Sequence, residues 1–208
     1  MRIKKTKFLS AFLLAVIGIL GIKAGYSYAG SNTNFNQSIN GNLGIGIVDS
    51  SGNNVASPSV SFSSLVFSMN SQTSTGTLGT SSEKIRVTNP TSTPTWTASI
   101  AATGGPTALW QGSDKNYDFN GSATAGQMTI NPTAGTITGA GSTSIANVSL
   151  GASNSFAQGT KDSIDLMSAA TGAQAPGQWD LTNVGISQTV PAGQAAQSYS
   201  IQMTVTIS

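Results

Sequence analysis

The stretch Tyr199-Ser-Ile-Gln-Met-Thr-Val-Thr-Ile-Ser208 decides the fold class. Its odd positions are apolar and its even positions are polar, which is the period of a strand with one buried and one exposed face. A second alternation runs from Phe35 to Ile47 and predicts a long half-buried strand, followed by a compact turn at Asp49–Asn54. Shorter alternations, separated by Gly, Pro and Asn, recur along the chain. Together they predict an all-β fold, an antiparallel β-sandwich.

Several segments between the two clear alternations have weaker patterns. Ser57–Met69 is rich in apolar residues and predicts one or two strands. Lys84–Val87 alternates and stops before Asn89-Pro90, and a further strand is expected over Trp96–Ile100. Asp162–Ala170 has the one pattern that suits a helix, but it is too short to predict one.

The composition excludes much chemistry. The 208 residues include 31 serines, 25 threonines and 24 glycines, but no cysteine and no histidine. Disulfides, thiolate nucleophiles, iron–sulfur clusters and the commonest general base are therefore excluded. Seven acidic residues leave open a hydrolase that uses two carboxylates. The simpler interpretation is that these acids lie in solvated loops, and we expect a non-catalytic protein without a cofactor.

The N-terminus has the pattern of a secretory signal peptide. A positive region is followed by the apolar run Phe8–Ile22 and by small residues at the two positions that precede a cleavage site after Ala29. The sequence therefore predicts a signal peptide at residues 1–29, a β-sandwich domain at residues 30–208, and secretion. Because Lys23 interrupts the approach to the cleavage site, an uncleaved anchor is the alternative. Membrane contact is expected only through this segment.

Cleavage would change the sign of the charge. Residues 30–208 carry four basic and seven acidic side chains, so the pI of 9.0 of the whole chain comes from the signal region. A domain with a net negative charge and no basic cluster is not expected to bind nucleic acid.

Four oxygen-bearing side chains alternate before a glycine and suggest calcium. They are Asp114, Asn116, Asp118 and Asn120. The last three, with Gly121, fit the opening of an EF-hand-type loop, although Gln127 stands where such a loop needs a glutamate. The alternative is a strand with Tyr117 and Phe119 inward and the four polar side chains outward.

The three tryptophans allow a carbohydrate-binding platform or a set of core anchors. Trp96 and Trp179 lie within apolar alternations, so we expect both to be buried. Trp110 precedes Gln111-Gly112 in an expected loop and is the best candidate for an exposed, ligand-binding aromatic residue.

The C-terminal region resembles a known family. Trp179-Asp-Leu181 fits a W-x-L motif, and Val190-Pro-Ala192 and the final alternating strand follow it. This arrangement resembles the C-terminal part of the WxL-domain surface proteins of Gram-positive bacteria. The resemblance implies a secreted β-rich protein that associates non-covalently with the cell wall through peptidoglycan, with Trp110, Trp179 and Leu181 as candidate binding residues. The family has a second W-x-L in its last strand, where this chain has Val205.

The sequence thus predicts a secreted, non-catalytic cell-surface protein of WxL-like type. Its expected partners are cell-wall polymer or other surface proteins. The alternative is a fibre subunit that donates Phe35–Ile47 to the sheet edge of a neighbour, since secreted cysteine-free β-sandwich subunits of biofilm-matrix fibres show a looser resemblance. The compact turn after this strand favours its pairing within one monomer. A secreted acid-pair hydrolase is the third alternative.

Overall fold

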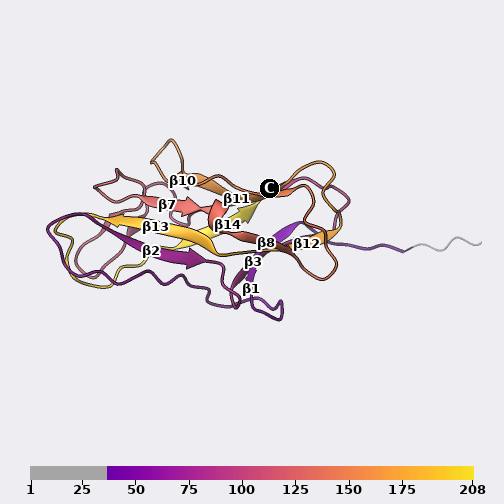
Figure 1. Ribbon diagram of the computed structural model, residues 1–208, viewed down its shortest axis with the longest axis horizontal. Helices are drawn as coiled ribbons and strands as arrows, with labels where there is room; N and C mark the ends of the chain where they lie inside the picture. The colour runs from indigo at the N-terminus through magenta and orange to yellow at the C-terminus, as the bar shows by residue number, and fades with distance from the viewer. Residues whose placement is uncertain (1–36) are drawn as a thin grey trace, which may run out of the picture. The chain divides into compact units, whose positions relative to one another are not determined.

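The alternating sequence folds into antiparallel sheets that pack around one core (Figure 1). The computed structural model describes residues 37–208, and Asn40–Ser208 form one compact unit. The prediction of an all-β, antiparallel sandwich is confirmed, and the described residues contain no α-helix. None of their helical turns could cross a bilayer. The signal peptide predicted at 1–29 lies outside the described residues.

Three four-stranded sheets and one hairpin make up this unit. The first sheet has the order β1 (Gly44–Val48), β3 (Lys84–Asn89), β12 (Gly177–Thr182) and β8 (Thr136–Gly139). The second has the order β10 (Asn154–Ser155), β7 (Met128–Asn131), β13 (Val184–Val190) and β2 (Gln72–Leu78). The third has the order β14 (Met203–Ile207), β4 (Trp96–Ala102), β11 (Ser163–Ala169) and β9 (Val148–Leu150). The hairpin pairs β5 (Leu109–Trp110) with β6 (Tyr117–Asp118), and a 3-10 turn, η1 (Pro132–Ala134), follows β7.

Two consecutive strands, β12 and β13, connect the first two sheets. β12 is an inner strand of the first sheet and β13 is an inner strand of the second, and only Asn183 separates them. Asn183 adopts a left-handed φ of 62°, and its N–H donates to the carbonyl of Gly79 at 2.6 Å. The two sheets therefore share a nearly continuous central strand.

The core lies between the faces of these sheets. Alternate residues of β3 and β4 are buried, as the period of two requires. Trp96 and Trp179 meet across the core with ring centroids 5.2 Å apart, so the prediction that both are core anchors is confirmed. The Nε1 of Trp179 donates to the carbonyl of Ser144 at 2.9 Å. The Nε1 of Trp96 is buried and has no hydrogen-bond partner among residues 37–208.

Two ion pairs that share the buried carboxylate of Asp180 cross the outer face of the first sheet. The guanidinium of Arg86 donates to both oxygens of Asp180, at 2.6 and 2.8 Å, and the Nζ of Lys84 lies 3.3 Å away. Burial by itself raises the pKa of the Asp180 carboxyl, but the hydrogen bonds and charges of the two cations outweigh it and hold the pKa below its ordinary value. Asp180 is therefore a charged anchor of the sheet.

Two strand predictions were too long. Of the strand expected from Phe35 to Ile47, β1 contains only Gly44–Val48; residues 37–43 form no strand, and Phe35 lies outside the described residues. Residues 37–42 are exposed, and no sheet of the described unit covers the side chain of Ile39. The expected C-terminal strand begins at Met203, because Ser200 makes only an isolated bridge to Gln111.

Two further segments differ from their predicted conformations. Ser57–Met69 forms no strand but runs extended along β2, with one bridge from Phe62 to Gly76. The segment with helical character is strand β11, and its register shifts between Asp165 and Met167. This bulge buries Leu166 and Met167 side by side, which breaks the period of two that would have revealed the strand.

A candidate chain-binding groove

The residues predicted to bind cell-wall polymer lie in the core. Trp179 and Leu181 are fully buried, and Trp110 is only 7% exposed. The prediction that Trp110 is an exposed loop aromatic is therefore wrong: it belongs to β5, and its ring stacks on Tyr117 at 5.9 Å. Trp179 and Leu181 therefore present no exposed face to a polymer in this conformation, and Trp110 presents very little.

The predicted calcium residues do not converge as a ligand set. Asp114 is exposed, and the Oδ1 of Asn116 accepts the N–H of Gly112 at 3.2 Å. Asn120 is buried and its Nδ2 donates to the carbonyl of Pro106 at 2.8 Å, so its predicted outward position is wrong. Within residues 37–208, no group of three or more acidic side chains is placed to hold a metal ion.

The four side chains instead belong to a hairpin and its loops. Asp118 ends β6, and Tyr117 and Phe119 on either side of it face the core, as the strand interpretation predicted.

Two carboxyl groups have altered affinities for protons. The pKa of Asp49 is lowered by hydrogen bonds from the backbone and side chain of Asn53, and that of Asp180 is also lowered. The general acid of a glycoside hydrolase needs a raised pKa. These two carboxyl groups therefore do not suit the general-acid role in the predicted acid pair.

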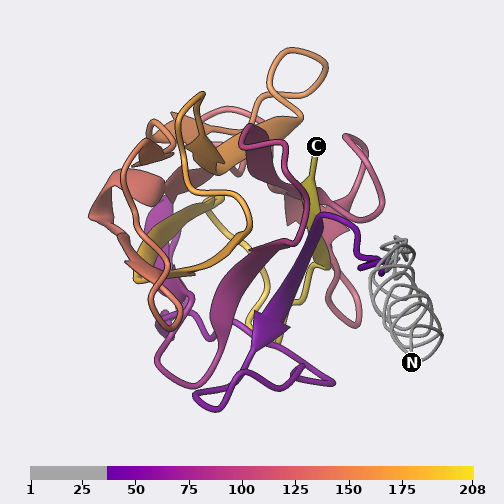
Figure 2. The same cartoon turned by 90° about the vertical axis from the view of Figure 1, so that its right-hand side faces the viewer.

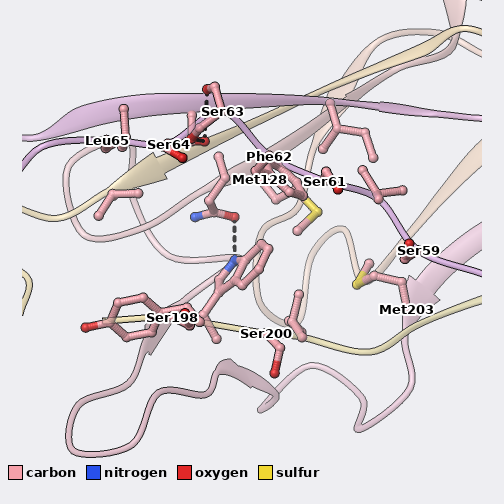
Figure 3. A pocket seen from close by; sticks show the side chains of 18 of the residues that line it. Ser59, Ser61, Phe62, Ser63, Ser64, Leu65, Met128, Ser198, Ser200 and Met203 are labelled. Atoms are coloured by element: carbon pink, nitrogen blue, oxygen red, sulfur yellow. Dashed lines mark hydrogen bonds between the residues drawn. The ribbon is translucent and has the colours of Figure 1, made fainter. Parts of the chain in front are cut away.

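A groove of about 990 Å³ lies between two extended segments (Figure 3). Residues 58–68 form one wall and residues 194–205 form the other. Figure 3 shows these walls running on opposite sides of the core residue Met128. The floor consists of buried residues from several strands: Ile100, Trp110, Met128, Ile130, Ile186 and Gln188. The base of the groove is mainly apolar.

The first wall offers an unpaired backbone edge. Within residues 60–67, only the N–H of Ser63 donates a backbone hydrogen bond to another described residue, the carbonyl of Thr75 at 2.8 Å. The Ser63 hydroxyl and carbonyl also bond Ser74, which fixes the segment beside β2. Because neighbouring residues of an extended chain point their backbone groups to opposite sides, Phe62 and Ser64 direct theirs toward the groove.

The second wall offers another such edge. Thr97 and Ser208 exchange backbone hydrogen bonds, and the N–H of Thr103 donates to the carbonyl of Gln202. The backbone N–H and C=O groups of the even residues of β14 therefore point toward β4, and those of Met203 and Val205 point away from it. β14 is the last strand of its sheet. An extended chain between the two walls could pair with both.

Aromatic side chains gather at one end of the groove. Phe62 meets Trp110 edge-on at 5.3 Å, and Tyr117, which stacks on Trp110, meets Tyr199 at 5.0 Å. Burial, followed by the nearby Tyr199, raises the pKa of Tyr117 to about 12. Tyr117 therefore stays uncharged at any physiological pH.

A buried glutamine holds this aromatic end in place. The Oε1 of Gln188 accepts from the Nε1 of Trp110 at 2.9 Å, and its Nε2 donates to the carbonyls of Thr189 and Asp118 at 2.8 and 3.2 Å. All the strong hydrogen-bonding groups of its amide are thus used. Sequence analysis missed Gln188, because it occupies an inward position of a strand that the alternation assigns to an apolar side chain.

The fold and the groove define a class, an all-β domain with a groove whose floor is mainly apolar. Comparison of the chain with protein-family models, with curated proteins and with solved structures gives no match.

Proposed function

We propose that this is a secreted, non-catalytic structural protein of the cell surface that self-associates by strand donation. The groove between residues 58–68 and 194–205 receives an extended segment from the N-terminal region of another copy. The observation that carries the proposal is the pair of unpaired backbone edges on either side of an apolar floor. A strand in this position would satisfy both edges and cover half-buried side chains on each wall.

The occupant is the segment from Phe35 to Leu43. It continues the alternation of β1 but is not part of that strand. Its length is compatible with the proposal, because nine residues of strand span about 30 Å and the first wall, residues 58–68, is eleven residues long. Phe35 and Ile39 share one face of this segment, and Leu43, at its end, continues that face into its own domain, against whose core it packs.

The test uses full-length mature protein, residues 30–208, with a matched pair of substitutions. Ile39→Asp places a charge on the apolar face of the donated strand, and Asn40→Asp places the same charge on the opposite face. We expect concentration-dependent filaments from the wild-type protein and from the Asn40→Asp variant, measured by light scattering and electron microscopy. We expect the Ile39→Asp variant to stay monomeric with an unchanged melting temperature. Equal assembly of both variants would refute strand donation.

We also propose an association with cell-wall polymer, as the WxL resemblance implies. Because the candidate aromatic residues are buried, exposed hydroxyl groups would make this contact. Thr73, Thr75 and Thr77 form an uncharged exposed row on β2 that suits a carbohydrate surface. Sedimentation with purified cell walls tests this, using the monomeric Ile39→Asp variant so that filaments do not sediment by themselves. No sedimentation above the protein-only control would refute wall binding.

A further inference from the structure

We infer that copies join head to tail, with the donated segment antiparallel to β14 and in line with the β1 strand of the accepting copy. In the same contact, the apolar tip of the accepting copy, defined as Leu65, Val66, Phe67 and Met69, packs against the end of the donor at which β1 begins. This inference rests on the proposed function, and it specifies the direction of the donated strand and a second contact surface.

The strand directions follow from the sheet pairing. β1 and β12 run in the same sense because both are antiparallel to β3. β12 continues through Asn183 into β13, so β1 also runs toward the end of the domain that contains Val190. In Figure 1 the arrow of β14 points opposite to that of β13. β1 and β14 are therefore antiparallel neighbours, and Figure 2 shows them side by side.

β1 fills only part of the space beside β14. It ends at Val48 and turns away through Asp49–Asn54, while Ile47 lines the near end of the groove. The groove continues along the second wall toward the Val190 end. A donated strand there would extend the line of β1, with the same neighbour and in the same sense.

The unbroken alternation of the N-terminal segment supports this continuity. Leu43, Ile45 and Ile47 pack against the core of their own domain. Phe35 and Ile39 have the same phase, so one long strand would direct its first apolar residues into the accepting copy and its last ones into its own copy. This explains why so long an alternation contributes only β1 to its own sheet.

The exposed large hydrophobic residues lie where this arrangement needs them. Apart from Ile39, which is in the donated segment, they are the apolar tip and Ile145. Val66, Met69 and Phe67 are 83%, 74% and 56% exposed. The tip lies at the Val190 end, because the carbonyl of Ser68 accepts the N–H of Gly193 at 2.9 Å.

Ile145 belongs to the opposite end of the domain. Its loop lies beside Gln178, because the N–H of Ala140 donates to the Gln178 carbonyl. Gln178 and Gly44, the first residue of β1, both pair with the same residue of β3, so the loop lies at the end where β1 begins. A head-to-tail contact would cover both apolar ends. The reverse direction would leave both exposed and would create a parallel pair beside β14, in a unit whose strand pairs are all antiparallel.

Cross-linking distinguishes the two directions cleanly because the chain has no cysteine. Single-cysteine variants of the mature protein are mixed in pairs, and a short bismaleimide joins cysteines of different copies. The donor variants are Asn36→Cys and Asn42→Cys, and the acceptor variants are Ser198→Cys and Thr204→Cys. All four positions are even, so in the proposed pairing they share the face away from the groove floor. The two acceptor positions are about 20 Å apart, beyond the reach of the linker.

We expect cross-linked dimers from Asn42→Cys with Ser198→Cys and from Asn36→Cys with Thr204→Cys, and their loss from the two exchanged combinations. Dimers only from the exchanged combinations would overturn the direction but leave strand donation intact. Filaments without any of these cross-links, or no filaments at all, would refute the proposed function itself. Each variant alone serves as the control for cross-links between identical positions.

The tip is tested separately, by Met69→Asp against Ser71→Asp, which adds the same charge at a nearby exposed polar position. Met69 belongs to the tip but does not line the groove. We expect Met69→Asp to weaken filament formation while the protein still binds a synthetic peptide of residues 31–43. We expect Ser71→Asp to leave both filament formation and peptide binding unchanged. Unchanged filament formation by Met69→Asp would remove the tip from the contact.

Discussion

Trp96 and Trp179 offer a matched test of what an unpartnered buried donor costs. Both indoles are buried, their rings touch, and replacement of either by Phe removes the same part of the ring. Trp179→Phe also loses the hydrogen bond to Ser144, worth about 1 kcal/mol. Trp96→Phe instead removes an N–H that has no partner, and relieves a desolvation cost of about 1–3 kcal/mol. We therefore expect Trp179→Phe to be more destabilising by about 2–4 kcal/mol.

Urea unfolding measures this difference. Far-ultraviolet circular dichroism follows the transition, and equal m-values for both variants would show that the midpoints can be compared as free energies. Trp110→Phe is the control, because it also breaks a made hydrogen bond, to Gln188, and should resemble Trp179→Phe. If Trp96→Phe costs as much as the other two substitutions, the argument from the unpartnered N–H is wrong.

Three further predictions concern stability. The pKa of Asp180 in the folded protein lies below its ordinary 3.8, so the carboxylate stabilises the fold above pH 3.8, and this stabilisation is lost as the pH falls through the folded pKa. Asp180→Asn should lower the free energy of unfolding by about 3–5 kcal/mol at pH 7. In melts at a series of acidic pH values, its melting temperature should also fall less steeply than that of the wild type. Gly126→Ala places a Cβ against the carbonyl of Asp118 at a φ of 115°, so it should lower the melting temperature more than Gly105→Ala, which meets nothing within 4 Å; equal losses would contradict the steric argument. Gln188→Leu leaves the buried Nε1–H of Trp110 without its acceptor and should lower the free energy of unfolding in urea by about 1–3 kcal/mol. An unchanged free energy of unfolding would show that water replaces the amide.

The sequence predicts the fold class because most strands bury one face. Val205 and Ile207 alternate with exposed threonines, and the sheet pairing follows that pattern. The pattern fails where a strand departs from the simple period. In β11 the bulge at Leu166 and Met167 places two apolar residues together, and a single chain without its partner strand gives no sign of it.

The groove was much harder to predict than the fold. Alternation identifies which side chains need to be buried, but it does not tell whether the same copy of the protein or another copy buries them. Residues 37–42 have a strand pattern and yet lie exposed, outside any strand. Trp110 illustrates the second difficulty, since its loop-like neighbours Gln111 and Gly112 hide the fact that Gln188, distant in sequence, buries it.

The shared strand β12–β13 has a consequence for how the domain opens. β12 and β13 each lie between two neighbouring strands, so both sheets form backbone hydrogen bonds to this one continuous stretch of chain. The hydrogen bond from Asn183 to Gly79 fixes the point where the stretch passes from one sheet to the other. If either sheet unfolded, the other would lose the ordered central strand to which its neighbours are hydrogen-bonded. The two sheets should therefore exchange their amide hydrogens as one cooperative unit, with the slowest exchange along this path, and should unfold together rather than one after the other.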